Sequence, residues 1–213
     1  MDKPVLFFDY DGVIIDSKQN TLDTLNLFFK KKRLDIKFSV NDLRKVFQGN
    51  FWENINIVLG GKSKITLNER NLFYNTKKEI QTPIVVFQDV LKVIKKIAND
   101  FKLIIVSSNH SKHIQKRLVD NNCDYYFYQI LGCDHIGNKE EKFRDIIKSN
   151  KNQNNFYLVT DSVGDLLEAE KSNIKTIAVT WGIHNKEDFE KFNPFVIIDN
   201  FFDLEENIKK LVF

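Results

Sequence analysis

Cysteine, proline and glycine are scarce in this sequence of 213 residues, and each scarcity excludes a class of protein. The two cysteines stand ten positions apart without a Cys/His set at metal-ligand spacing, which excludes a disulfide scaffold and a zinc ribbon. We therefore expect Cys123 and Cys133 to be reduced, buried thiols. Three prolines and eight glycines argue against a disordered chain, and no apolar run approaches the ~18 residues of a membrane helix.

An excess of charge of one sign is also lacking. The formal net charge is +3 and there is no long basic tract, so we expect no nucleic-acid partner. An apolar strand follows Met1 almost directly, with no signal or transit segment before it, which predicts a cytoplasmic protein without a membrane partner. Hydrophobic residues make up 42% of the chain, which suffices for one packed domain with a modest insertion.

The stretch from Val5 to Ser17 contains the most informative local pattern. Four apolar residues run into two aspartates one residue apart and then a glycine, which predicts a buried strand that ends in a turn. Asp9 and Asp11 therefore lie at the carboxyl end of a strand, the edge at which open α/β sheets bind ligands.

Two carboxylates so close together repel each other unless a cation or a shared proton lies between them. Asp9 is ionised at neutral pH and could attack phosphorus without a base to activate it. Asp11 could hold a proton in a shielded site and protonate a leaving oxygen. The alternative is an exposed turn that merely contains acidic residues.

From Asp89 onward apolar strands alternate with amphipathic helices, which is typical of a parallel sheet with right-handed crossovers. Before that, between Ser17 and Thr82, the pattern is helical, so we expect a small all-helical insertion. The predicted strands are 103–106, 126–131, 156–159, 176–180 and 195–198, and the predicted helices among and after them are 111–121, 140–148, 164–172 and 204–212.

Polar side chains stand at the ends of other predicted strands. Ser107 directly follows one strand, and Asp161 follows another, four residues before Asp165. Because the carboxyl ends of parallel strands meet at one edge of a sheet, we expect these groups to converge on Asp9. Asp9, Asp161 and Asp165 would offer three hard oxygen ligands, which suit Mg²⁺. The alternative is that Asp161 and Asp165, four residues apart, lie on a solvated face of a helix.

A lysine at the same edge would neutralise a phosphoryl group. Lys139 is the first candidate, and Lys142 competes with it because the helix there fixes the register poorly. The segment from Ser17 to Thr82 has 13 Lys and Arg against 6 Asp and Glu, a charge of +7 that leaves −4 for the remainder. A basic insertion facing an acidic site would suit an anionic substrate held on a metal; a helix surface that happens to be rich in lysine is the alternative.

Five segments occur in the order and at the spacing of a known family: DYDGV at 9–13, LIIVSSN at 103–109, Lys139, VTDSVGD at 159–165 and IAVTWG at 177–182. On these segments the chain resembles the haloacid dehalogenase-like (HAD) hydrolases over essentially its whole length. In particular it resembles the phosphoglycolate phosphatase/β-phosphoglucomutase type, which has a helical cap.

The resemblance implies an α/β fold, a Rossmann-like doubly wound parallel sheet of order 3-2-1-4-5, with a core of residues 1–16 and 83–213 and a helical cap of residues 17–82 inserted after the first strand. It implies a Mg²⁺-dependent phosphatase that hydrolyses a small phosphorylated metabolite through an aspartyl-phosphate intermediate, and we expect a monomer or weak homodimer. The implied roles are nucleophile for Asp9, acid and then base for Asp11, phosphoryl binding for Ser107, Ser108, Asn109 and Lys139, and Mg²⁺ binding for Asp9, the Asp11 carbonyl, Asp161 and Asp165.

Three positions depart from the family pattern. Thr160 replaces the usual glycine before the acidic pair, and Gln88-Asp89 replaces the Pro-Gly at which the cap returns to the core. Glu140 replaces the proline after the lysine, which keeps Lys142 open as the phosphoryl-binding residue.

Other functions compete with the phosphatase. Dehalogenases lack the second aspartate, so the presence of Asp11 disfavours them. Mutases of the β-phosphoglucomutase type carry a histidine where Thr21 stands, and phosphonatases use a cap lysine that the sequence cannot single out. A catalytically silent binding or regulatory protein is the alternative from another class, and the retention of both Asp9 and Asp11 argues against it.

We expect the cap to supply substrate specificity through the break at 49–52, which could form a loop over the site. The alternative is that Phe51 and Trp52 seal the core of the helical segment.

Overall fold

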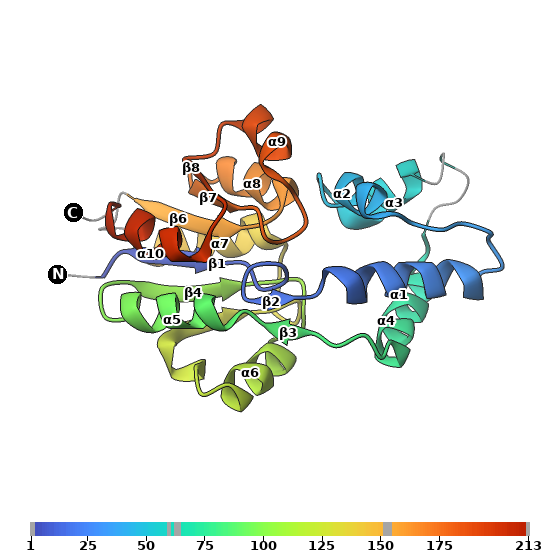
Figure 1. Cartoon of the computed structure of the whole chain (residues 1–213), viewed down its shortest axis with the longest axis horizontal. Coiled ribbons are helices and arrows are strands. Elements are labelled where there is room, and N and C mark those ends of the chain that lie inside the picture. Colours follow the sequence, from blue (N-terminus) through green and yellow to red (C-terminus); the bar gives the residue numbers. More distant parts are fainter. Residues whose placement is uncertain (1–2, 59–60, 62–64, 151–154, 212–213) are drawn as a thin grey trace.

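The computed structural model describes residues 3–58, 61, 65–150 and 155–211. A six-stranded sheet forms its centre (Figure 1). Its strands are β1 (Val5–Phe8), β4 (Lys102–Val106), β5 (Phe127–Leu131), β6 (Phe156–Thr160), β7 (Lys175–Val179) and β8 (Val196–Ile198). They lie in the order β5-β4-β1-β6-β7-β8, and every neighbouring pair is parallel. Numbered within the sheet this is 3-2-1-4-5-6, so the predicted order is confirmed and β8 extends it.

The strands form because their side chains are apolar on both faces of the sheet. All four residues of β1 are fully buried, and β1 lies between β4 and β6. Successive side chains of a strand point to opposite faces, so Leu6 and Phe8 join one hydrophobic cluster and Val5 and Phe7 join another. Burial on both faces is typical of a parallel sheet covered by helices.

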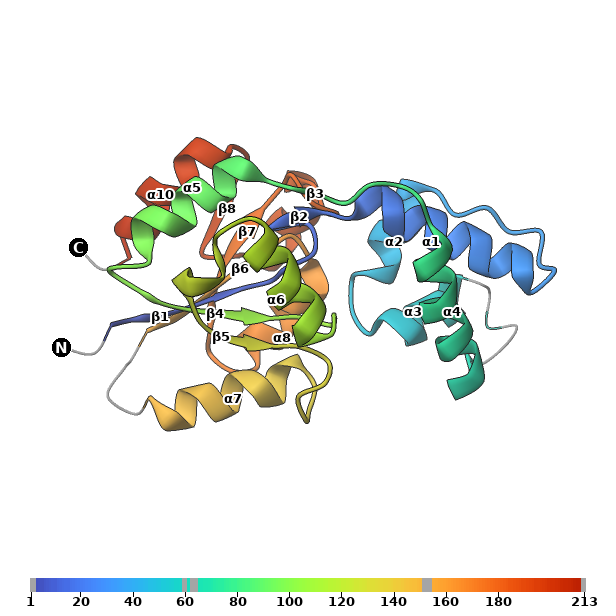
Figure 2. The same cartoon turned by 90° about the horizontal axis from the view of Figure 1, so that it is seen from below.

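Helices cover the two faces of this sheet (Figure 2). They are α5 (Gln88–Ile97), α6 (Ser111–Asp120), α7 (Lys139–Ser149), α8 (Val163–Glu170), α9 (Lys186–Phe189) and α10 (Phe201–Lys209), with single 3₁₀ turns η1 (Asp124–Tyr126) and η2 (Glu190–Phe192). The apolar sides of α5, α6 and α10 pack on the face that carries Leu6 and Phe8. Phe143 of α7 and Ala169 of α8 pack on the opposite face.

Four more helices lie beyond the sheet and are called here the helical unit: α1 (Lys18–Lys31), α2 (Val40–Val46), α3 (Phe51–Val58) and α4 (Leu67–Glu79). The unit has a hydrophobic cluster of its own, built around Leu25, Phe28 and Leu43. It stands opposite the carboxyl ends of the strands (Figure 1). Ile183, from the loop after β7, is buried in the same cluster, so the sheet and the helical unit share apolar contacts.

A short antiparallel ribbon joins the helical unit to the sheet. It pairs β2 (Ile15–Asp16) with β3 (Val85–Val86), one on each connection between the two parts. The sequence did not predict this ribbon, because two-residue strands contain too few positions for an alternating pattern.

Other differences from the predictions are local. The helix expected at 204–212 begins at Phe201, because the Asn200 side chain accepts a hydrogen bond from the Phe202 amide and caps it; Val212 lies outside the described residues. Cys123 is buried as expected, but the prediction that Cys133 is buried is wrong, because Cys133 lies exposed in the loop after β5. In the described part of the chain, no helix combines the length and apolarity that crossing a membrane requires.

Candidate active site

The strand ends bring the predicted acidic residues to one edge of the sheet. Asp9 directly follows β1, and its amide donates to the carbonyl of Val159 at 2.9 Å, which extends the pairing of β1 with β6 by one residue. Asp161 follows β6 directly, and Asp165 lies in the first turn of α8. All three aspartates are buried, with 9% exposure or less. Buried carboxylates are rare unless something pairs with their charge, so this edge is a candidate site.

Lys139 provides an ammonium group for these acids. It begins α7, and its Nζ lies 2.9 Å from Oδ1 of Asp9 and 2.5 Å from Oδ2 of Asp165. Lys142, the competing candidate, is also buried, but its Nζ donates to the carbonyl of Gly132 at 2.7 Å. The helix register therefore brings Lys139 to the carboxylates and turns Lys142 toward the loop after β5.

Burial is the largest influence on the ionisation of these groups. It raises the pKa of Asp9 well above its usual range, and the Lys139 ammonium opposes this. Burial also raises the pKa of Asp161 to about 7, against the hydrogen bond from the Ile183 amide. Burial alone would lower the pKa of Lys139, but the carboxylates of Asp165 and Asp9 raise it above its ordinary value. One ammonium thus faces three buried carboxyl groups.

Backbone atoms enclose the carboxylate of Asp161. Its Oδ2 accepts a hydrogen bond from the amide of Ile183 at 2.7 Å. Gly12, whose φ is +70°, and Gly182 lie so close that a Cβ at either position would overlap this carboxylate. The sequence pattern placed Gly12 in a turn but gave no sign that two glycines make room for Asp161.

Asp11 lies on the other side of the site. Its Oδ2 accepts a hydrogen bond from Nδ2 of Asn109, and the Asp11 carboxyl group is one of the acidic neighbours that raise the pKa of Asp161. Ser107 is buried, and its Oγ accepts a hydrogen bond from the Asn109 amide at 3.1 Å. Ser108 is exposed. The turn after β4 therefore lies beside the Asp9–Asp11 segment, as the sequence predicts.

Thr160, which replaces the family's usual glycine, has a defined place. It is fully buried, its Oγ1 donates to Oδ2 of Asp165 at 3.2 Å, and it accepts from the amide of Ser162 at 3.1 Å. The extra hydroxyl holds the Asp165 carboxylate that Lys139 also contacts, so the departure adds a hydrogen bond to the site.

His184 lies behind Asp161, although the sequence gave no reason to assign it a role. The ring is buried, and burial lowers its pKa, so the imidazole is neutral. Its Nδ1 accepts from the Val163 amide at 3.3 Å, and its Nε2 donates to the carbonyl of Arg44 in α2 at 3.0 Å. The Arg44 side chain in turn donates to the carbonyl of Ile183 at 3.1 Å. These bonds tie α2 to the loop that encloses Asp161.

A second contact joins the helical unit to the start of α8. The amide of Gly164 donates to the carbonyl of Phe47 at 2.9 Å. The loop between α2 and α3 thus touches the acidic edge of the sheet. Within that loop, Asn50 accepts from the amides of Trp52 and Glu53 and so caps α3. The rings of Phe51 and Trp52 pack against Phe73 inside the helical unit, with centroids 5.6 and 5.2 Å away.

The donor chemistry of the site suits a hard divalent cation. Asp9 and Asp161 are buried carboxyl groups that share a single ammonium with Asp165, and Mg²⁺ prefers oxygen ligands of this kind. As the side chains stand, no three His, Cys, Asp or Glu residues in the described part of the chain are arranged around a metal position. Lys139 lies between Asp9 and Asp165 instead. The residues fit the cation by charge and donor type.

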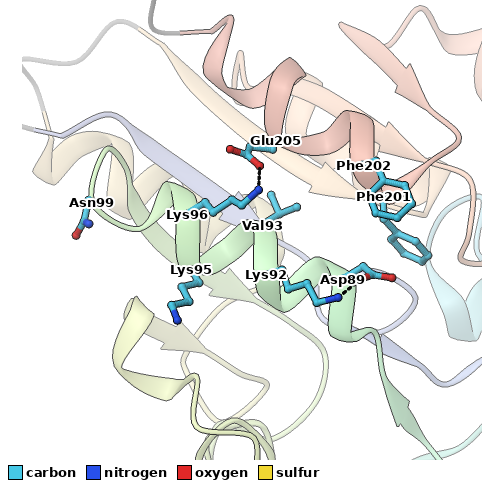
Figure 3. A pocket seen from close by; sticks show the side chains of 9 residues that line it. All are labelled: Asp89, Lys92, Val93, Lys95, Lys96, Asn99, Phe201, Phe202 and Glu205. Atoms are coloured by element: carbon cyan, nitrogen blue, oxygen red, sulfur yellow. Dashed lines mark hydrogen bonds and ion pairs between the residues drawn. The ribbon is translucent and has the colours of Figure 1, made fainter.

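A hollow of about 550 Å³ between α5 and α10 is the alternative location for a site (Figure 3). Two of its three lysines are already paired: Lys92 Nζ lies 2.7 Å from Asp89, and Lys96 Nζ lies 2.6 Å from Glu205. None of the predicted site residues lines it. The converging carboxylates at the sheet edge therefore remain the candidate active site.

Comparisons with known proteins find relatives and solved structures that match nearly the whole chain. The chain is 25% identical to a phosphoglycolate phosphatase of Psychrobacter arcticus, over 99% of this chain and 97% of that protein. It is 23% identical to the pyrophosphatase PpaX of Listeria monocytogenes, over 93% of each chain. A solved hydrolase from Pseudomonas syringae shares the fold, with a TM-score of 0.80, 14% identity and coverage of 98% of this chain and 99% of that one.

The family assignment rests on a family model that matches most of the chain. The model of a family described as haloacid dehalogenase-like hydrolase matches residues 6–179, which include Asp9, Ser107 and Asp161. The chain therefore belongs to the haloacid dehalogenase-like hydrolase family, as the resemblance found in its sequence predicts.

Proposed function

We propose that this protein is a Mg²⁺-dependent phosphatase that hydrolyses a small phosphorylated metabolite through an aspartyl-phosphate intermediate. The observation that carries the proposal is the contact of Lys139 Nζ with Asp9 and Asp165 at the carboxyl edge of the sheet, beside Asp161. The names of two relatives, a phosphoglycolate phosphatase and a pyrophosphatase, support phosphoryl transfer to water as the reaction class.

In this proposal Asp9 is the nucleophile. One of its carboxylate oxygens attacks phosphorus, the bond from phosphorus to the leaving oxygen breaks, and an acyl phosphate forms on Asp9. The ammonium of Lys139 offsets the negative charge of the phosphoryl group and of the nucleophile. Ser107, Ser108 and Asn109, on the turn after β4, bind the phosphoryl oxygens.

Asp11 moves the proton. In the first step its carboxyl proton passes to the leaving oxygen, which departs as a neutral alcohol or acid. In the second step the Asp11 carboxylate takes a proton from water, which attacks phosphorus and releases phosphate from Asp9. The hydrogen bond from Asn109 Nδ2 holds the Asp11 side chain in place for both steps.

Asp9, Asp161 and the carbonyl of Asp11 would hold Mg²⁺, with Asp165 supporting it directly or through water. The cation would stabilise the negative charge that spreads over the phosphoryl oxygens. The buried, incompletely neutralised carboxyl groups of Asp9 and Asp161 support this assignment. Asp165 also orients Lys139 and shares a hydrogen bond with Thr160.

The helical unit would act as a cap, with residues 17–82 as the cap and residues 1–16 and 83–213 as the core. Its position opposite the strand ends and its contacts through Arg44 and Phe47 support this division. The ribbon of β2 and β3 joins the two parts. A cap over the site favours a small substrate and excludes bulk water from the acyl phosphate.

The test is release of inorganic phosphate from 2-phosphoglycolate, pyrophosphate and p-nitrophenyl phosphate with Mg²⁺. We expect turnover by the wild type that EDTA abolishes and that Asp9→Asn reduces by at least about 10³-fold, as expected for loss of a nucleophile. Asp145→Asn, which changes an exposed acid on α7, is the matched control and should keep wild-type activity. Unchanged turnover in Asp9→Asn, or a wild type inactive on all phosphate esters and anhydrides, would overturn the proposal.

A further inference from the structure

A lysine of the helical unit reaches the candidate active site. Lys77 lies in α4, and its Nζ donates to Oδ1 of Asn109 at 3.3 Å. The amide nitrogen of the same Asn109 side chain donates to Oδ2 of Asp11. The carboxamide is thus oriented by a cation on one side and a carboxylate on the other. Two hydrogen bonds separate the Lys77 ammonium from the proposed acid of the reaction.

The charge of Lys77 is not compensated by a neighbouring acid. Within the residues that the structure describes, the only partner of its Nζ is the neutral amide oxygen of Asn109. By contrast, Lys31 and Lys32 at the end of α1 each lie 2.5 Å from a glutamate. The Lys77 side chain is half-buried, so bulk water screens its charge less than that of an exposed lysine. An anion bound beside Lys77 would supply the negative charge that no neighbouring residue of the described chain provides.

The two lysines at the site contact different residues. Lys139 contacts Asp9, the proposed nucleophile, and is neutralised by two carboxylates. Lys77 is linked through Asn109 to Asp11, the group that would protonate the leaving oxygen. The leaving group must lie next to Asp11 to receive its proton. Lys77 is therefore connected to the residue that would meet the leaving group, whereas Lys139 contacts the nucleophile.

We infer that Lys77 binds a second anionic group, carried by the leaving part of the substrate. This inference rests on the proposed function and narrows its substrate class to compact phosphate esters or anhydrides whose leaving group is itself an anion. A carboxylate and a second phosphoryl group share the chemistry that an ammonium recognises. Lys77 is thereby a specificity-determining residue of the helical unit.

The experiment compares three substrates: 2-phosphoglycolate, with a carboxylate; pyrophosphate, with a second phosphoryl group; and ethyl phosphate, with a neutral leaving group. The quantity measured is the ratio of kcat/KM for each doubly anionic substrate to kcat/KM for ethyl phosphate. We expect the wild type to prefer at least one of the first two, and Lys77→Gln to lower that ratio at least about tenfold, the size expected when one partner of a shielded charge pair is removed. The substrate whose ratio falls identifies the anion as a carboxylate or a phosphoryl group.

Two further variants make the result specific to the charge at position 77. Lys77→Arg keeps the cation and should keep most of the preference. Lys78→Gln removes a neighbouring exposed lysine of α4, whose Nζ contacts Asn75, and should leave the ratio at the wild-type value. The melting temperature of each variant shows that it is folded.

The outcomes separate this inference from the proposed function. A wild type inactive on all three substrates would refute the proposed function and the inference with it. An active wild type without a preference for either doubly anionic substrate would overturn the inference alone. The inference also fails if Lys77→Gln lowers kcat/KM equally on all three, because Lys77 would then act by positioning Asn109 and Asp11.

Discussion

Two single substitutions, Lys139→Met and Lys142→Met, test the geometry of the site through the stability of the protein. Lys139→Met keeps an unbranched apolar stem but removes the ammonium that lies 2.9 Å from Asp9 and 2.5 Å from Asp165. Removing one partner of a buried ion pair costs about 3–5 kcal/mol, because the remaining charge is left buried and unpaired. A domain of ordinary stability has roughly 5–15 kcal/mol in total, so this loss is a large part of it.

Lys142→Met is the matched control in the same helix. It removes one hydrogen bond, from Nζ to the carbonyl of Gly132, and burial already lowers the pKa of this lysine. The expected cost is roughly 1 kcal/mol, the net value of one hydrogen bond. The assay is urea unfolding at pH 8 in EDTA, followed by tryptophan fluorescence, with phosphate release measured separately on each variant in Mg²⁺ without EDTA or urea.

We expect Lys139→Met to lower the free energy of unfolding by several times as much as Lys142→Met, and to be the variant that loses activity. Added Mg²⁺ should restore part of the stability of Lys139→Met, since a bound cation offsets the charge of Asp9 and Asp161. If Lys142→Met proves the more damaging substitution in both assays, the assignment of Lys139 to the carboxylates is refuted.

Contacts elsewhere in the described residues give three more predictions. In Gly164→Ala the new Cβ would lie 2.9 Å from the Phe47 carbonyl oxygen, which should weaken the contact between the helical unit and α8. We expect faster proteolysis at residues 47–50 and a lower kcat/KM. Unchanged cleavage and activity would contradict this prediction. Cys133 is exposed, whereas burial raises the pKa of Cys123 to about 11, so a thiol reagent should label Cys133 rapidly and Cys123 slowly. If rapid labelling persists in Cys133→Ser, this assignment is wrong. Hydrogen bonds from Ser111, the first residue of α6, hold the pKa of Asp134 below its usual range. The ionised Asp134 therefore stabilises the start of α6 fully above the ordinary carboxyl pKa, and this stabilisation is lost as the pH falls through the lowered pKa of Asp134. Asp134→Asn should therefore lower the melting temperature more at pH 7 than at pH 3, and an equal effect at both would count against that role.

The centre of the sheet could be predicted from the sequence because β1, β4 and β6 each contain an unbroken apolar run. β1, β4 and β6 are buried on both faces, and a carboxylate or hydroxyl follows each run directly. Parallel strands end at one edge by geometry, so Asp9, Ser107 and Asp161 could be placed together without knowledge of any contact.

The choice between Lys139 and Lys142 could not be made in the same way. Both lysines stand in the first turns of α7, and only the orientation of that helix decides which one meets the carboxylates. The same limit applied to Lys77, one of many lysines between Ser17 and Thr82, because its distance to Asn109 depends on how α4 packs. The roles of Gly182 and His184 depend on the path of the loop after β7, which leaves no periodic pattern in the sequence.

The proposed reaction depends on Asp9 as the residue that takes the phosphoryl group, and a single-turnover experiment tests this directly. Wild-type protein mixed with substrate and Mg²⁺ is quenched in acid, which preserves an acyl phosphate, and the modified peptide is located by mass spectrometry. We predict one phosphoryl group on Asp9 in the wild type and none in Asp9→Asn. A phosphoryl group on any other residue, or an active wild type that never carries one, would contradict this mechanism.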